Sequence, residues 1–177
     1  MTHFARALGA ARSGNPDTAK AEIAKLGDLR DKLRQAKDAY WAEQVDIQAQ
    51  IATAWLLYAE GKYDEALRAM SAAADAEDRT EKHPVTPGVP TPARELYGTM
   101  LLERGMAKEA LAAFEATLHK EPHRLGATLG AAAAAEKSGD AAKAREHYAA
   151  AVALTEGADP VRPQIAQARE YIAKSAR

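Results

Sequence analysis

The residues best spaced for chemistry are two histidines, His119 and His123, which lie four positions apart with Glu115 one helical turn before the first. Side chains at this spacing can share one face of a helix, where they could hold a metal ion. Pro122 stands between the two histidines at an expected helix end, however, so they need not share a face. Zinc needs three or four ligands in a fixed geometry. We therefore predict no metal site and interpret these residues as solvated side chains at a helix end.

Other signatures of catalysis are absent from the sequence. There is no glycine-rich phosphate loop, no serine in a nucleophile-elbow setting and no HExxH pair. The chain contains no cysteine, which excludes disulfides and thiolate metal sites. The adjacent carboxylates Asp64 and Glu65 fall in the first turn of an expected helix, where the helix dipole accounts for acidic residues. The sequence thus predicts neither an enzyme nor a bound cofactor.

Composition narrows the remaining classes of function. The 177 residues include 24 basic and 25 acidic side chains, which gives a formal net charge of −1. This balance argues against a general binder of nucleic acid or of anionic membranes, because such proteins need a basic surface. No apolar run approaches the ~20 residues of a membrane span, and the first ten residues lack the features of a signal peptide. We expect a cytoplasmic protein if the chain is complete, but its start in mid-pattern favours a fragment of a longer protein.

The elements that must position any site are helices arranged in a repeat. Four segments each contain a helix, a glycine, a short turn, an alanine five positions after the glycine and a larger residue four positions later. The glycines are Gly14, Gly61, Gly105 and Gly139, the alanines are Ala19, Ala66, Ala110 and Ala144, and the larger residues are Ile23, Met70, Phe114 and Tyr148. Glycine ends a helix readily because it adopts left-handed backbone angles without steric cost. A facing alanine lets two helices approach closely, so the pattern predicts repeated helical hairpins.

The spacing and the residue types resemble the tetratricopeptide repeat, a helix–turn–helix unit of about 34 residues. Gly105 and Gly139 lie one such period apart, and Gly98, Tyr63 and Pro122 match further marks of the family. The resemblance implies an all-α solenoid of helical hairpins that forms a right-handed superhelix. An unrelated antiparallel bundle is the alternative. The chain also looks like the C-terminal portion of long, uncharacterised bacterial tetratricopeptide-repeat proteins, which implies a bacterial source and a missing N-terminal region.

We expect a single domain over residues 1–177, divided into consecutive segments. They are a degenerate repeat at about 3–37, a repeat at about 38–80, a proline-rich insert at 81–90, repeats at 91–124 and 125–155, and a capping helix at about 161–177. The first glycine interval exceeds the repeat period without containing a proline, so we expect long helices in the N-terminal half. Val161, Ile165, Ala168 and Ile172 form an apolar stripe with a polar remainder, as a terminal capping helix requires.

The resemblance also implies which side chains face the concave groove in which such repeats bind partners. They are Phe4, Leu8, Ile51, Trp55, Tyr58, Glu95, Thr99, Leu102 and Glu103, followed by Leu129 and Glu136. This strip is aromatic and aliphatic with acidic edges, which fits a peptide with apolar anchors and some basic character. The first four positions are apolar here but carry Lys and Asn in members that clamp chaperone C-termini, so such acidic tails are not expected. For Trp55 and Tyr58, packing in the core is the competing interpretation.

The insert carries local signals at both ends and in its middle. His83 precedes Pro84, which predicts that the preceding helix ends near there. Residues 86–89 have the pattern of a type II turn, and Thr91 followed by Pro92 predicts the start of the next helix. We therefore expect an ordered loop packed on adjacent helices. The polar residues of the insert that could also contact a ligand are Glu81, Lys82 and His83.

These observations favour a protein-interaction scaffold that holds a peptide or partner segment in its concave groove. The expected partner is a protein or peptide, or the missing N-terminal part of a longer chain, with no nucleic acid and no membrane span. The alternative is an accessory C-terminal domain of a larger enzyme or small-molecule-binding protein whose chemistry lies upstream.

Overall fold

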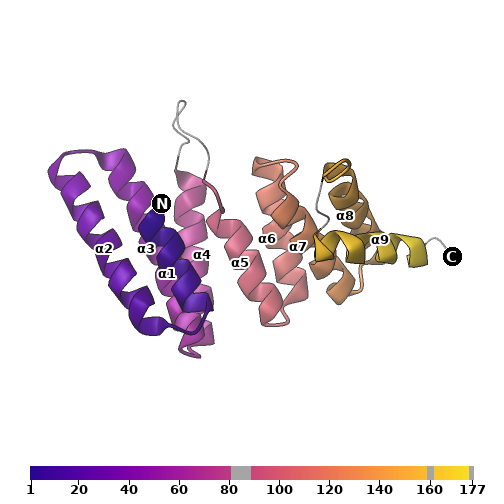
Figure 1. Cartoon of the computed structure of the whole chain (residues 1–177), viewed down its shortest axis with the longest axis horizontal. Coiled ribbons are helices and arrows are strands. Elements are labelled where there is room, and N and C mark those ends of the chain that lie inside the picture. The colour runs from indigo at the N-terminus through magenta and orange to yellow at the C-terminus, as the bar shows by residue number, and fades with distance from the viewer. Residues whose placement is uncertain (81–88, 159–161, 176–177) are drawn as a thin grey trace. The chain divides into compact units, whose positions relative to one another are not determined.

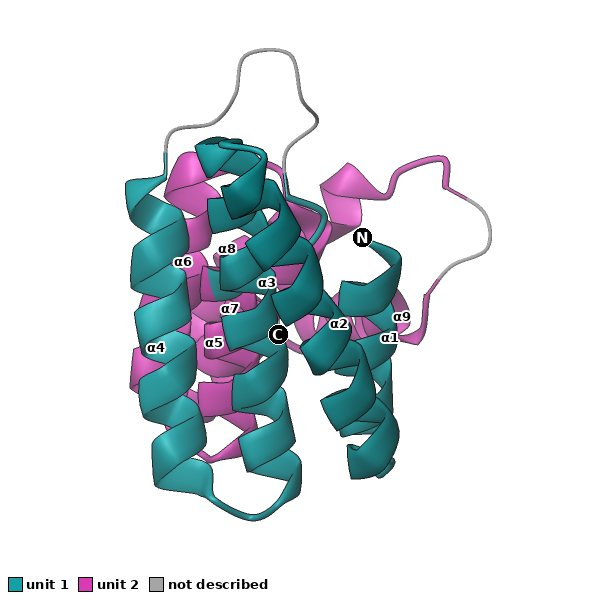
Figure 2. Ribbon diagram, turned by 90° about the vertical axis from the view of Figure 1, so that its left-hand side faces the viewer, with its two compact units in different colours: residues 1–93 teal, residues 94–177 magenta. Residues whose placement is uncertain are grey.

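The structure, a computed structural model, describes residues 1–80, 89–158 and 162–175. These residues form α-helices joined by short connections and contain no strand (Figure 1), so the all-α fold class expected from the sequence is confirmed. The chain divides into two compact units, Met1–Ala93 and Arg94–Arg177 (Figure 2). We call them unit 1 and unit 2 and describe each by itself.

The described part of unit 1 consists of two helical hairpins. Their helices are α1 (Thr2–Arg12), α2 (Pro16–Gln35), α3 (Ala39–Ala59) and α4 (Tyr63–Arg79). Helix α1 packs on both α2 and α3, and α3 packs on α4. The expectation of long helices in the N-terminal half is met by α2 and α3, which have 20 and 21 residues. Leu26, Ile51 and Met70 are among the largest fully buried side chains of this unit.

The turns of the hairpins confirm the role predicted for the repeated glycines. Gly14, Gly61, Gly105 and Gly139 all have left-handed backbones, with φ between +76° and +83°. The turn between α2 and α3 has no glycine, and Lys37 takes the left-handed conformation there with φ +58°, which is uncommon for a residue with a side chain. A side chain caps the N-terminus of each of these two helices. At the start of α2, Asn15 Oδ1 accepts from the Thr18 N–H, and at the start of α3, just after this turn, Asp38 Oδ1 accepts from the Trp41 N–H, each at 3.2 Å.

Unit 2 continues with further hairpins and a last helix. Its helices are α5 (Ala93–Glu103, beginning at the unit boundary), α6 (Ala107–Lys120), α7 (Leu125–Ser138), α8 (Ala141–Leu154) and α9 (Pro163–Ser175). Helix α9 packs on α8. It buries Ile165 and Ala168, and the ring of Tyr171 lies 4.8 Å from that of Tyr148 on α8. The last helix therefore covers the end of the second hairpin, as the sequence predicts for a capping helix.

The repeated alanines lie where helices meet. Ala19, Ala66, Ala110 and Ala144 are all 0% exposed. The larger residue four positions later is buried in three of the four hairpins, as Met70, Phe114 and Tyr148. The first hairpin differs, because Ile23 is only half-buried and the preceding residue, Glu22, is buried instead. The first repeat therefore departs from the other three in the register of its second helix.

Glu22 is a buried charge on α2, with 2% of its surface exposed. His3 Nδ1 lies 2.6 Å from Glu22 Oε2, and Lys25 Nζ and Arg6 Nη2 lie 3.0 and 3.1 Å from Glu22 Oε1. The hydrogen bonds from His3 and Lys25, with the nearby Arg6 charge, lower the pKa of the Glu22 carboxyl against the opposing effect of burial. Because His3 and Arg6 belong to α1, this carboxylate ties α1 to α2.

The structure describes the two ends of the segment that holds the insert. Helix α4 ends at Arg79, before the expected end near His83. Helix α5 begins at Ala93, one residue after Pro92, and the Ala93 N–H donates to the Glu77 carboxylate of α4 at 2.6 Å. The candidate residues Glu81, Lys82 and His83, and most of the expected type II turn, lie outside the described residues.

Candidate partner-binding site

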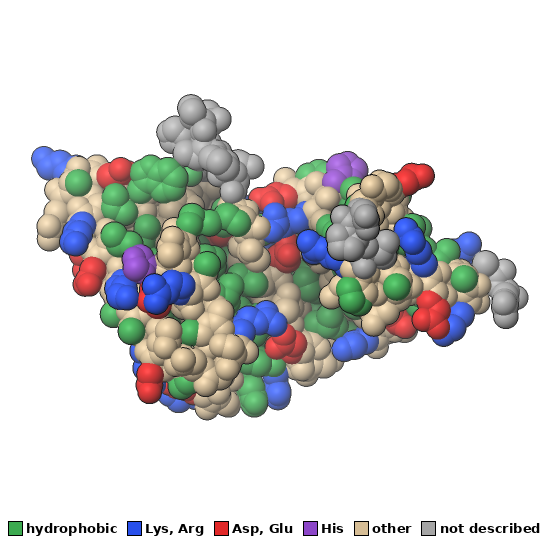
Figure 3. Space-filling view, in the orientation of Figure 1, with side chains coloured by type: hydrophobic (Ala, Val, Ile, Leu, Met, Phe, Trp, Pro, Cys, Tyr) green, Lys and Arg blue, Asp and Glu red, His purple; other side chains and the backbone are tan. Residues whose placement is uncertain are grey.

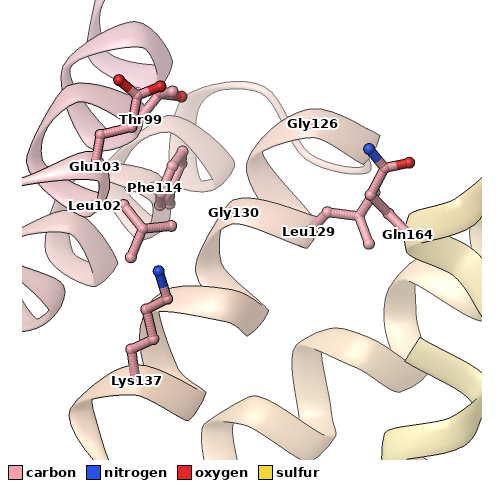
Figure 4. Close-up of a pocket in the computed structure, with 9 residues that line it drawn as sticks. All are labelled: Thr99, Leu102, Glu103, Phe114, Gly126, Leu129, Gly130, Lys137 and Gln164. Carbon is pink, nitrogen blue, oxygen red and sulfur yellow. The ribbon is translucent and has the colours of Figure 1, made fainter. Parts of the chain in front are cut away.

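A hollow opens among the helices of unit 2 (Figure 4). It has a volume of about 320 Å³, near the lower end of the range for ligand-binding pockets. Its lining consists of Thr99, Leu102 and Glu103 from α5, Phe114 from α6, Gly126, Leu129, Gly130 and Lys137 from α7, and Gln164 from α9. We call this feature the unit 2 hollow. Four helices that are separate in the sequence thus contribute to one concave surface.

The floor of the unit 2 hollow depends on the ring of Phe114, which is 2% exposed. A Cβ atom added to Gly98 on α5 would lie 3.0 Å from this ring, and one added to Gly130 on α7 would lie 2.5 Å from it. Real Cβ atoms essentially never approach as closely as the second distance. The two glycines therefore let one aromatic ring fit between two helices, and the ring gives the hollow an apolar base.

One side of α7 is fixed by a carboxylate from α5. Glu95 forms a close ion pair with Arg124, the residue that precedes α7, and Arg124 also lies 3.2 Å from Glu121. The Glu95 carboxylate reaches the first turn of α7 at Gly126, where a side chain would collide with it. A negative charge at this end of a helix is favourable because the N-terminus carries a partial positive charge. Glu95 is therefore engaged within unit 2, which weakens the case for it as an acidic edge that attracts a basic partner.

The polar groups of the unit 2 hollow lie around its apolar base. Figure 4 shows the Lys137 ammonium directed toward Leu102, with the Glu103 carboxylate beyond Leu102 and with Gln164 beside Leu129. The Thr99 hydroxyl donates to the Glu95 carbonyl at 3.0 Å and keeps its capacity to accept a hydrogen bond. This arrangement can take up an apolar side chain and offer polar contacts to the groups next to it.

Several groove residues expected from the sequence lie at this hollow. Thr99, Leu102 and Glu103, and also Leu129, line it. Sequence reasoning did not find Phe114, Lys137 or Gln164 as lining residues, nor Gly126 and Gly130. The two glycines carried a usable signal, because a glycine inside a helix is costly and often marks a close approach of another group.

The expected groove residues of unit 1 have a different environment. Phe4, Ile51 and Trp55 are 5%, 0% and 2% exposed, and Leu8 and Tyr58 are half-buried. The physical reason is that α1 packs directly on α3, so the side chains that these helices turn toward each other are covered. In this structure Phe4, Ile51 and Trp55 stabilise the core of unit 1, and a partner could reach them only after α1 moved away.

Trp55 lies in an aromatic chain that ends near the surface. The Arg12 guanidinium lies 4.3 Å from the centre of the Trp55 ring, a distance typical of a cation–π contact. Tyr58 packs edge-on against Trp55 at 5.3 Å and against Tyr63 at 5.0 Å. The interpretation of Trp55 and Tyr58 as packing residues, raised as an alternative from the sequence, fits these contacts.

Neither a charged patch on the face in Figure 3 nor a metal site among the described residues is evident. Acidic and basic side chains are interspersed on that face (Figure 3). Within the described ranges, no three His, Asp or Glu side chains gather as a metal site would require. Glu115, which precedes His119 by one turn, instead lies 2.7 Å from Lys143 and 3.6 Å from His147 on α8. None of the described helices is both long and apolar enough to cross a membrane.

The chain matches no protein-family model. It also matches no curated protein. Among solved structures it is similar to the crystal structure of PcrH from Pseudomonas aeruginosa, with a TM-score of 0.58 and 16% sequence identity over 75% of this chain and 92% of PcrH. These comparisons supply no sequence relative for the narrower resemblance to long bacterial proteins. At this identity the likeness shows the fold alone, and together with the helical hairpins described above it shows that the chain has a tetratricopeptide-like helical-repeat fold.

Proposed function

We propose that this chain is a protein-binding scaffold and that the unit 2 hollow takes up an apolar side chain of a partner segment. The observation that carries the proposal is the apolar base made by Phe114, Leu102 and Leu129 within a concave surface of four helices. Short segments commonly bind helical proteins by placing apolar anchors into grooves between helices. The similarity to PcrH supports a scaffold of this fold and says nothing about the partner.

The polar lining of the hollow fits binding. Thr99, Glu103, Lys137 and Gln164 surround the base and come from three different helices. A few polar groups around an apolar cavity orient a ligand and give specificity, whereas the apolar contact supplies most of the affinity. No chemical step is needed to account for these residues.

The test is capture of short peptides of known sequence on an array, with both peptide ends capped, by the full chain and by two variants. Leu102→Ala removes part of the base of the hollow, and Leu118→Ala is the matched control because Leu118 is a half-buried leucine of α6 that does not line the hollow. We expect wild type and Leu118→Ala to capture one shared set of peptides that carry large apolar side chains. Leu102→Ala should lose most of that set while its thermal unfolding stays close to that of the control. Equal capture by both variants, or no capture by wild type, would overturn the proposal.

A further inference from the structure

We propose that Lys137 gives the unit 2 hollow a preference for partner segments with an acidic side chain next to the apolar anchor. The inference rests on the proposed function, because it concerns the same hollow. Lys137 lies in the last turn of α7, is exposed, and directs its ammonium group toward Leu102, one residue of the apolar base (Figure 4). Within the described ranges, this ammonium has no hydrogen bond or ion pair. A cation that faces an apolar hollow without a partner fits a ligand that brings the opposite charge.

Carboxylates near this lysine in the sequence make other contacts, and Asp140, three residues on, accepts a hydrogen bond of 3.0 Å from the Lys143 N–H. Glu136, its neighbour along α7, accepts a hydrogen bond of 2.7 Å from the Tyr148 hydroxyl on α8. Glu95 is paired with Arg124 at the other end of α7. The Glu103 carboxylate lies beyond Leu102 as seen from Lys137 in Figure 4. The positive charge of Lys137 is therefore available to pair with an acidic group of a partner bound in the unit 2 hollow.

The lysine also has a simpler explanation, which the experiment must separate from the proposal. A basic residue in the last turn of a helix interacts favourably with the helix dipole. If that were its whole role, replacing it would change the stability of α7 and leave the choice of peptide unchanged. A role in recognition predicts the reverse, because the ammonium group is exposed and contributes little to folding.

The acidic group is expected on a side chain within the partner segment. A C-terminal carboxylate is bound by clusters of backbone N–H groups or, in the repeat proteins that clamp chaperone C-termini, by Lys and Asn side chains together. The lining of the unit 2 hollow has one Lys and no Asn. The start of α7 lines the hollow at Gly126, and the Glu95 carboxylate covers that turn. Lysine acts as a compact point charge with three donors, so a single Asp or Glu side chain suits it. The occupant is thus an internal segment of a protein in which an apolar residue neighbours an acidic one.

The experiment uses the same array of capped peptides, so that no peptide has a free C-terminal carboxylate. The peptides captured by wild type and lost by Leu102→Ala define the set that depends on the hollow. Within that set we expect Asp and Glu to be enriched beside the apolar anchor. Lys137→Gln should weaken capture of the acidic members by about two- to fivefold, as expected for a partly exposed ion pair, and Lys137→Glu should favour peptides with Lys or Arg there.

Lys108→Glu is the matched control, because Lys108 is an exposed lysine of α6 outside the hollow. It should leave the peptide preference unchanged, and added salt should reduce the acidic preference of wild type. This inference is overturned if the peptides whose capture depends on Leu102 show no enrichment in Asp and Glu, or if that enrichment persists in Lys137→Glu. Either result leaves the proposed function standing. The absence of any set that depends on Leu102 overturns both. Because Lys137 is exposed, Lys137→Gln is expected to fold, and far-UV circular dichroism of that variant checks this.

Discussion

Replacing Gly130 with alanine tests the packing that forms the base of the unit 2 hollow. Gly130 lies in the middle of α7, and a Cβ atom there would lie 2.5 Å from two carbon atoms of the Phe114 ring. The ring is 2% exposed and is also bounded by Gly98 on the opposite helix, so it has little room to move. We therefore expect Gly130→Ala to be destabilising although alanine is the better helix former.

Two opposing effects set the magnitude. Alanine in place of glycine inside a helix stabilises by about 1 kcal/mol, whereas overpacking a dense core costs about 1–3 kcal/mol. The net change should be a loss of up to about 2 kcal/mol. Gly27→Ala is the reference, because Gly27 is also inside a helix, α2, but has no heavy atom within 4 Å of its added Cβ. That change should stabilise by up to about 1 kcal/mol.

A double-mutant cycle with Phe114→Leu isolates the collision. Leucine lacks the two ring carbons that an added Cβ would approach most closely, Cε1 and Cζ, so Gly130→Ala should be clearly less destabilising in that background. Urea unfolding followed by far-UV circular dichroism gives the four free energies of unfolding.

If Gly130→Ala stabilises the protein equally with Phe114 and with Leu at position 114, the ring does not occupy the space beside α7. The milder change Gly98→Ala, whose Cβ would lie 3.0 Å from the same ring, should give a smaller coupling with Phe114→Leu. A larger coupling for Gly98 than for Gly130 would also contradict the packing described here.

Two further predictions concern buried positions elsewhere. Ala110→Leu should destabilise the protein by about 1–3 kcal/mol through overpacking, because Ala110 is 0% exposed. The control Lys108→Leu on the same helix should change the stability by no more than about 0.5 kcal/mol. Equal shifts of the two variants in thermal melts would contradict the close helix contact assigned to Ala110. The stabilisation linked to the lowered pKa of Glu22 is present above the ordinary carboxyl value of 4.5 and is lost as the pH falls below it. Glu22→Gln should therefore be less stable at neutral pH and unfold with a weaker dependence on acid, and identical acid titrations of the two proteins, followed by circular dichroism, would disprove this.

The sequence predicts those features of the fold that depend on local signals. The glycines that end helices and the alanines between helices recur at fixed offsets, because each hairpin needs the same turn and the same close contact. The left-handed residue between α2 and α3 gave no such signal, since Lys37 is not a glycine. His123 is a second case, with φ +64° just before α7. In both turns the surrounding structure imposes a conformation that the residue type does not favour.

The candidate site was only partly predictable for a related reason. Alignment of the sequence to the tetratricopeptide repeat places Thr99, Leu102 and Glu103 on one face of α5, and this face lines the hollow. The contributions of Lys137 and Gln164 depend on how side chains from α7 and α9 converge in space, which spacing along one helix does not specify. The same alignment predicts that Trp55 on α3 faces the groove. It cannot show that α1 packs on α3 in unit 1, where Trp55 is buried.

The helices that contact each other are close together in the sequence, and this has a consequence for how quickly the chain folds. Among the described residues, the extensive helix–helix contacts join elements that are next to each other in the sequence or, for α1 and α3, separated by one helix. Contacts between nearby segments cost little loop entropy, so proteins of this kind fold in microseconds to milliseconds. Helix α9 packs chiefly on α8, whereas α7 and α8 each pack extensively on two described helices. Amide exchange should therefore begin at α9 and reach the interior helices of unit 2 last.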